Sequence, residues 1–133
     1  MKILIVDDSA TMRMILKKGL TSALKGTDVI FLNAADGQAG LDNIKENLDI
    51  DYIFLDVNMP IMNGDKMLEI MRSTPEMKHI KVIMQTTEGS SEKVKFLSSL
   101  GISGYLLKPY TLDIVKALME RLISVHAQSE ATA

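Results

Sequence analysis

Three acids and one lysine lie at the ends of short apolar runs in this sequence. A charged side chain beside a core is costly unless it is paired or binds a metal. The residues concerned are Asp7 and Asp8 after Lys2–Val6, Asp56 at the end of Tyr52–Asp56, and Lys108 at the end of Gly104–Lys108. Because apolar runs of this length predict buried strands, all four residues are expected at strand ends.

Gathered in one pocket, these residue types point to phosphoryl transfer. Three carboxylates repel one another, and a hard cation relieves that repulsion. Oxygen ligands without His or Cys suit Mg²⁺. Lys108 is a compact charge that can stabilise a phosphoryl oxygen, and the Thr86 hydroxyl can donate to another. A carboxylate can itself be the nucleophile, so the residues indicate metal-assisted transfer of a phosphoryl group to Asp56.

The elements that must position these residues follow a β-α pattern repeated five times. Apolar runs predict strands, and apolar residues at helical spacing predict the helices between them. The predicted strands are Lys2–Val6, Asp28–Asn33, Tyr52–Asp56, Ile80–Thr86 and Tyr105–Leu107. Five helices are predicted: one from the N-cap Ser9 to Leu24, one that contains Leu41–Leu48, one that contains Met67–Met71, and two over Ser91–Leu100 and Leu112–Ser124. Ile15, Leu48 and Leu112 are among the residues expected to face inward.

This alternation predicts an α/β fold, a doubly wound five-stranded parallel sheet with helices on both faces. Ligands of such sheets bind beyond the carboxyl ends of the strands. The residues predicted there are Asp7, Asp8, Asp56, Thr86 and Lys108. The fold can therefore bring together residues that are far apart in the sequence.

Composition predicts one domain over residues 1–126, followed by a flexible tail, Ala127–Ala133. The chain has 133 residues, is 47% hydrophobic and carries a net charge of -2, which argues against nucleic-acid binding by bulk electrostatics. It contains no cysteine, so a disulfide framework, a thiolate zinc site and a cysteine nucleophile are excluded. Its apolar runs are too short for a membrane span or a signal peptide. We therefore expect a soluble, cytoplasmic protein.

Four stretches, taken together, resemble the response-regulator receiver domains, and among them the single-domain chemotaxis regulators. They stand in family order and at family spacing. They are Ile5-Val6-Asp7-Asp8-Ser9, Leu55-Asp56-Val57-Asn58-Met59-Pro60 with Asn63-Gly64, Gln85-Thr86-Thr87-Glu88, and Gly104-Tyr105-Leu106-Leu107-Lys108-Pro109-Tyr110-Thr111. The resemblance extends from Lys2 to about Val125. It implies a flavodoxin-like sheet with strand order 2-1-3-4-5.

The resemblance also implies a role for each matching residue. Asp56 is the expected phosphoacceptor, and Lys108 and Thr86 are expected to contact the phosphoryl group. Mg²⁺ is expected to be held by Asp7, Asp8, the Asp56 side chain and the backbone carbonyl of Asn58. The Lys108–Pro109 bond is expected to be cis.

Thr86 and Tyr105 are the expected switch, which reports phosphorylation to the face built from the last two helices and the last strand. Asn58 and Glu88 are expected to tune dephosphorylation. Thr87 stands where many relatives have a smaller residue, which bears on access to the phosphoryl group. Tyr110 stands where many have Phe.

The expected function is that of a monomeric phosphorylation switch that catalyses only its own phosphorylation and dephosphorylation. A histidine kinase is the expected donor, the flagellar motor switch the expected partner, and a phosphatase a further one. No nucleic-acid or membrane partner is expected. The alternative within this class is a phosphorelay intermediate that passes its phosphoryl group to a histidine phosphotransfer protein.

Other classes of function fit the sequence less well. An aspartate-nucleophile phosphatase would have a second Asp two residues after the nucleophile, where this chain has Asn58. A flavin binder would suffer repulsion between its phosphate and Asp7-Asp8. A mere interaction scaffold would not need Asp56 and Lys108. Each residue taken alone also has a simpler interpretation, since Asp7-Asp8 could cap a helix, Asp56 could lie in a turn, and Lys108 could be a surface lysine.

Overall fold

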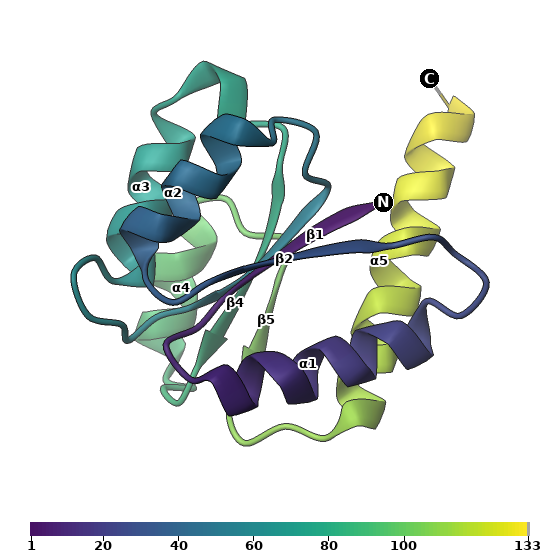
Figure 1. Cartoon of the computed structure of the whole chain (residues 1–133), viewed down its shortest axis with the longest axis horizontal. Helices are drawn as coiled ribbons and strands as arrows, with labels where there is room; N and C mark the ends of the chain where they lie inside the picture. The colour runs from purple at the N-terminus through teal and green to yellow at the C-terminus, as the bar shows by residue number, and fades with distance from the viewer. Residues whose placement is uncertain (133) are drawn as a thin grey trace.

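The computed structural model describes the backbone of residues 1–132 and the side chains as far as Val125 (Figure 1). Strands and helices alternate along the chain, with one short 3-10 helix, η1. In order they are β1 (Lys2–Val6), α1 (Ala10–Ala23), β2 (Ile30–Ala34), α2 (Gly37–Glu46), β3 (Tyr52–Asp56), α3 (Gly64–Arg72), η1 (Pro75–Met77), β4 (Lys81–Thr86), α4 (Ser91–Ser99), β5 (Gly104–Leu107) and α5 (Leu112–Thr132).

The five strands form one parallel sheet in the order β2-β1-β3-β4-β5, which confirms the predicted topology. In register, Val6 pairs with Leu55, and Asp56 pairs with Gln85. Because all strands run in the same direction, their carboxyl ends lie along one edge of the sheet. Residues that follow strands far apart in the sequence therefore meet at that edge.

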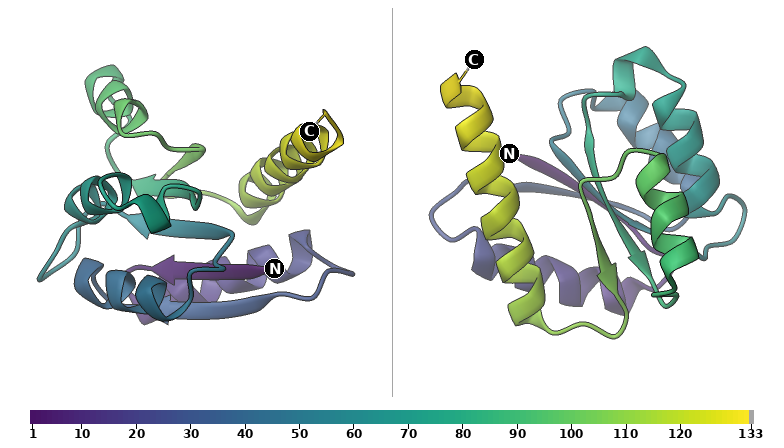
Figure 2. Two further views of the ribbon diagram at one scale, coloured as in Figure 1. Left: turned by 90° about the horizontal axis from the view of Figure 1, so that it is seen from above. Right: turned by 180° about the vertical axis from the view of Figure 1, so that it is seen from behind.

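Helices cover both faces of the sheet (Figures 1 and 2). One buried cluster lies beneath α2, α3 and α4 and includes Leu4, Leu55 and Met84 from the sheet. The other lies beneath α1 and α5 and includes Ile5, Phe54 and Ile83, among others. Successive side chains of a strand point to opposite faces, so strands that are apolar throughout supply both clusters.

Short polar side chains start the five α-helices. The Ser9 hydroxyl accepts a hydrogen bond from the backbone N–H of Met12, as the sequence predicted for the first helix. Such an acceptor satisfies one of the free N–H groups of a first helical turn. The other caps of this kind are Asp36 for α2, Asn63 for α3, Ser90 for α4 and Thr111 for α5.

Several predicted details differ in the structure. Strand β2 is Ile30–Ala34 instead of Asp28–Asn33, and α5 continues to Thr132, so helical backbone extends through most of the predicted tail. Three residues that were predicted to face inward are exposed to solvent. Their exposed fractions are 41% for Ile15, 45% for Leu48 and 46% for Leu112. Ile15 lies beside the buried stripe of α1, which consists of Leu16, Gly19 and Leu20. Ala133 and the side chain of His126, expected at the surface, lie outside the described residues.

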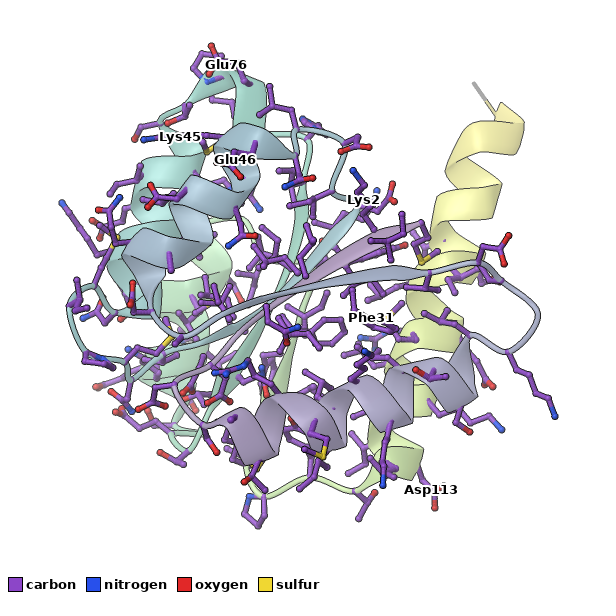
Figure 3. All side chains as sticks on the ribbon, in the orientation of Figure 1. Lys2, Phe31, Lys45, Glu46, Glu76 and Asp113 are labelled. Carbon is purple, nitrogen blue, oxygen red and sulfur yellow. The ribbon has the colours of Figure 1, made fainter. Side chains whose placement is uncertain are left out.

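Lysines pack against the sheet and its loops in two places, near Lys2 and Phe31, which are labelled in Figure 3. Lys2, at the start of β1, bonds through its Nζ to Asp49 at 3.0 Å and Asn47 at 3.3 Å. Phe31 of β2 lies toward α1, and the Nζ of Lys17 is 5.5 Å from its ring centroid. None of the helices within residues 1–132 has the length and apolar character needed to cross a membrane.

Arg72 ends α3 at the edge of the sheet where the strands begin. Its guanidinium is half-buried, and burial lowers its pKa. It donates only to backbone carbonyls among the hydrogen bonds described for it. The acceptors are Lys78, Ile80, Leu100 and Gly101, at 2.7–3.2 Å. Arg72 therefore joins the end of η1, the approach to β4 and the end of α4.

Candidate functional site

Two strand ends place carboxylates next to each other at the carboxyl edge of the sheet. Asp56 is the last residue of β3, and Asp7 follows β1 directly. The two strands are paired, and both acids are buried, with exposures of 1% for Asp7 and 7% for Asp56. Asp8 comes next in the chain and is exposed. The structure thus brings together the three acids that the sequence singled out.

Lys108 follows the edge strand β5 and reaches both buried acids across the end of β4. Its Nζ lies 3.0 Å from Asp7 Oδ2 and 3.3 Å from Asp56 Oδ1. Its backbone N–H donates to the Thr86 carbonyl at 2.7 Å, which ties it to the end of β4. The Lys108–Pro109 peptide bond is cis. The lysine is therefore held over the two carboxylates by its own backbone.

The loop after β1 fixes the orientation of Asp7. The backbone N–H of Ser9 donates to Asp7 Oδ1 at 2.9 Å, and the Arg13 guanidinium donates to the Asp7 carbonyl. With Lys108 on Oδ2, both carboxylate oxygens of Asp7 have a donor. The Asp7 carboxylate is consequently held from both sides.

The charges at this edge are incompletely balanced. Burial raises the pKa of Asp56, and the negative charges of Asp7 and Asp8 raise it further, against the opposing effect of Lys108. Burial alone would lower the pKa of Lys108, but its hydrogen bond to Asp7 and the charge of Asp56 outweigh burial and raise it. Lys108 therefore balances only part of the negative charge of Asp7, Asp8 and Asp56.

The acid cluster fits a hard divalent cation. One carboxylate oxygen from each of Asp7, Asp8 and Asp56 lies within 4.8 Å of the other two. Carboxylate oxygens are the ligands that Mg²⁺ prefers, and one exposed acid leaves room for the waters that Mg²⁺ retains. The donor set thus matches the expected metal, with Asn58 exposed in the adjoining loop.

Gly64 lets the loop after β3 close over the strand end. A Cβ at this position would lie 2.1 Å from the Asp56 carbonyl oxygen, so a side chain cannot be accommodated without moving backbone. The Gly64 N–H donates to the Val57 carbonyl at 2.9 Å. Glycine is therefore required for α3 to begin beside the phosphoacceptor candidate.

The remaining predicted residues lie around the cluster, and they range from buried to exposed. Thr86 is buried at the end of β4, and its Oγ1 accepts from the backbone N–H of Glu88 at 2.9 Å. Thr87 and Glu88 are exposed. Tyr105 is 44% exposed and pairs with Met84, so it shares a sheet face with Thr86. The two predicted switch residues are thus neighbours on one face.

An ion pair joins the two helices that flank the loop after β4. Lys93 Nζ lies 2.8 Å from Asp65 Oδ2, and both side chains are mostly buried, with exposures of 17% and 20%. Asp65 is in the first turn of α3, and Lys93 is near the start of α4. The sequence analysis missed this pair because nothing local relates two residues on separate helices.

Two further polar residues beside the cluster were missed. Tyr110 Oη donates to Gln85 Oε1 at 2.6 Å, and Gln85 is 1% exposed. Burial and the charges of Asp7 and Asp56 raise the pKa of Tyr110 to about 12, so its hydroxyl stays protonated near neutral pH. The available signal was the polar residue Gln85, which directly follows the apolar run Val82–Met84.

Comparison with known proteins agrees with this geometry. The family model of the response regulator receiver domain matches residues 3–120. The chain is 37% identical over 126 residues to chemotaxis protein CheY1 of Helicobacter pylori, covering 95% of this chain and 99% of that one. It is 38% identical over 125 residues to CheY-3 of Vibrio cholerae, covering 92% of this chain and 91% of that one.

A solved structure of a CheX-CheY-BeF3-Mg+2 complex from Borrelia burgdorferi is similar as well. The TM-score is 0.78 at 32% identity, with coverage of 94% of this chain and 88% of that chain. The sheet order, the family match and the identity to chemotaxis regulators agree along almost the whole length. The chain is a response regulator receiver domain, closely related to the CheY chemotaxis proteins.

Proposed function

We propose that this protein is a phosphorylation switch in which Asp56 accepts a phosphoryl group. One observation carries the proposal, namely that Lys108 Nζ lies within 3.0–3.3 Å of Asp7 and Asp56 at the edge where three acids crowd. This arrangement keeps the nucleophilic carboxylate of Asp56 next to Lys108, whose ammonium group can stabilise the negative charge on a phosphoryl oxygen. The close relation to CheY proteins supports the same role.

In the proposed reaction, an Asp56 carboxylate oxygen attacks the phosphorus of the donor. The new O–P bond forms as the bond to the donor breaks, and the leaving group departs with that electron pair. Lys108 then donates to a phosphoryl oxygen, and the Thr86 hydroxyl donates to another. Asp7, held by Ser9 and Lys108, keeps the pocket in shape.

Asp7, Asp8, the Asp56 side chain and the Asn58 carbonyl would hold Mg²⁺, which would neutralise the negative charge that gathers during transfer. The exposed Asn58 and Glu88 flank the approach of a hydrolytic water, so they would set the lifetime of the phosphorylated state together with Thr87. Because these side chains contact solvent, they can act on hydrolysis without disturbing the core.

The proposed output is the face formed by α4, β5 and α5. When Thr86 turns its hydroxyl to the phosphoryl group, it gives up its bond to the Glu88 N–H, and Tyr105 on the same sheet face adjusts. Tyr105, Leu107 and Ile114 expose 44%, 46% and 52% of their surface, which offers a partner apolar contact. We propose a histidine kinase as donor and the flagellar motor switch as the partner, following the related chemotaxis proteins.

The test is phosphorylation by a small-molecule donor. Incubation with acetyl phosphate and Mg²⁺ should add one phosphoryl group to the intact protein, measured by mass spectrometry. Asp56→Asn should abolish the addition, whereas Asp113→Asn, which changes an exposed acid of α5, should not. Equal labelling of Asp56→Asn would overturn the assignment of the phosphoacceptor.

A further inference from the structure

Gln85 is a buried polar residue directly opposite Asp56 in the sheet. It is 1% exposed, and it pairs with Asp56 between β3 and β4. Its carbonyl accepts from the backbone N–H of Val57, the residue after Asp56, at 3.0 Å. The backbone of Gln85 is thus bonded to the strand end that carries the proposed phosphoacceptor.

The side chain of Gln85 lies on the same face of the sheet as that of Asp56. Phe54 and Ile83 pair between the same strands and both belong to the cluster beneath α1 and α5. Because side chains alternate, the residues two positions further on, Asp56 and Gln85, share that face. Neighbouring strands are about 4.8 Å apart, so the Gln85 side chain leaves its strand next to that of Asp56, on the sheet face that carries the acids.

Lys108 enters the pocket from the other side of Gln85. Leu106 pairs with Gln85 and lies in the same buried cluster, so Lys108, two positions further on, projects to the same face. Gln85 therefore occupies the strand position between the phosphoacceptor candidate and the lysine. Its side chain is well placed to influence how the two groups face each other.

Tyr110 holds the Gln85 side chain and the lysine segment together. Its hydroxyl donates to Gln85 Oε1 at 2.6 Å, while the Lys108 N–H donates to the Thr86 carbonyl at 2.7 Å. These two bonds attach the segment that carries Lys108 to adjacent residues of β4. Tyr110 also packs against the cluster beneath α1 and α5, which restricts its ring.

The other end of the Gln85 amide has no partner. Nε2 is buried and makes no hydrogen bond with any residue that the structure describes. Because Tyr110 engages Oε1, the NH₂ group is the end that remains free. A buried donor without an acceptor costs free energy, so its retention beside an anionic pocket points to an acceptor that it reaches only in the working state.

We propose that Gln85 and Tyr110 are a positioning pair for phosphoryl transfer to Asp56. Tyr110 fixes the amide and the Lys108 segment, and the free NH₂ group of Gln85 supplies a donor that steadies the carboxylate when Lys108 turns to the phosphoryl group. The inference rests on the proposed function of Asp56. It predicts an effect on the maximal rate of phosphorylation and none on metal binding.

Three variants test the pair, namely Gln85→Met, Tyr110→Phe and their combination. Each should lower the maximal rate of labelling by acetyl phosphate about tenfold, the size expected for one hydrogen bond to a charged group. Half-saturation by Mg²⁺, measured by isothermal titration, should stay at the parent value. The combined variant removes both polar partners and should melt near the parent temperature, yet its labelling should stay slow.

The matched control is Ile83→Val, two residues earlier on the same strand and the same face. It should lower the melting temperature and leave the labelling rate unchanged. If the combined variant labels at the parent rate, the pair is structural only and the inference is overturned. If the parent protein is not labelled by acetyl phosphate, or if Asp56→Asn is labelled equally, the proposed function is wrong. That outcome does not depend on the variants of Gln85 and Tyr110, so it is distinguished from failure of the positioning pair.

Discussion

Two cations at opposite edges of the sheet, Arg72 and Lys108, have contrasting surroundings. Where the strands begin, the single guanidinium of Arg72 donates to four neutral carbonyl groups. Where the strands end, the ammonium of Lys108 lies between two carboxylates, with a third acid nearby. Arg72 is thus matched with several uncharged acceptors, and Lys108 with more negative charge than one cation can balance.

The difference separates stability from function within one sheet. Hydrogen bonds from a charged donor to otherwise unpaired carbonyls hold segments in place, so Arg72 fastens the connections around β4 and β5. Repulsion among carboxylates is a cost that a cation or a change of charge can remove, so the Lys108 edge responds to ligands. Substitutions at the two edges should therefore move different observables.

The largest expected effect is on stability, at the Arg72 edge. Arg72→Met should lower the free energy of unfolding by about 3 kcal/mol, because several carbonyls lose a charged donor. Urea denaturation measures the loss, and the folded protein should still be labelled by acetyl phosphate at the parent rate. Arg72→Lys should recover only part of the stability, because an ammonium lacks the planar fork that reaches several acceptors. If Arg72→Met is as stable as the parent, the hydrogen bonds of Arg72 do not stabilise the fold and the contrast with Lys108 fails.

The next effect is on rate, at the Lys108 edge. Lys108→Met should slow labelling of Asp56 by about a hundredfold, since it removes the cation that balances charge on the phosphoryl group. Lys108→Arg, which keeps the charge but changes its geometry, serves as the matched control and should be intermediate. Time courses followed by intact mass give both rates. Labelling of Lys108→Met at the parent rate would show that the acids and the metal suffice.

Mg²⁺ should stabilise the protein through the acid edge alone. A ligand that binds only the native state adds about 2.7 kcal/mol when it is present at a hundredfold excess over its dissociation constant. Thermal melts with and without Mg²⁺ measure the shift. Asp8→Ala should abolish it, whereas Asp113→Ala, at the start of α5 (Figure 3), should retain it. An equal shift in both variants would place the effect outside the cluster.

The smallest effect concerns Asp56 in metal-free protein. Its pKa is raised above the ordinary 3.8 by burial and by Asp7, so ionisation at neutral pH disfavours the folded state. Asp56→Asn should therefore raise the free energy of unfolding by on the order of 1 kcal/mol near neutral pH. The gain should shrink as the pH falls through the raised pKa, because the parent carboxyl is then protonated in the folded state. Urea denaturation midpoints of the parent and of Asp56→Asn, measured from acidic to neutral pH, test the sign of this change in stability. If Asp56→Asn is less stable than the parent at neutral pH, the prediction is wrong.

The acid edge could be predicted from the sequence because its signal is local. Each of Asp7, Asp56 and Lys108 ends or follows an apolar run, and parallel strands bring such ends together. The strand bounds agreed for β1 and β3 and shifted by one or two residues elsewhere. The strand order itself came from the resemblance, because apolar runs do not reveal which strands are neighbours.

The Arg72 edge and the polar neighbours of the site could not be predicted. Arg72 bonds to carbonyl groups, which every residue has, so no pattern of side chains marks its partners. The Asp65–Lys93 pair depends on how two helices lie relative to each other. Gln85 was visible as a polar residue after an apolar run, but its meaning depends on pairing with Asp56 and on Tyr110.

The separation of Lys108 from its partners along the chain bears on how the protein is made. Lys108 and Asp7 are 101 residues apart, whereas all three acids are synthesised by residue 56. At about 5–20 residues per second, the ribosome needs roughly 3–10 s to add the residues from Asp56 to Lys108. During this interval a nascent chain carries the acids without their lysine. The ion pairs of Lys108 with Asp7 and Asp56 can therefore form only late in synthesis, after β1 and β3 have both been made.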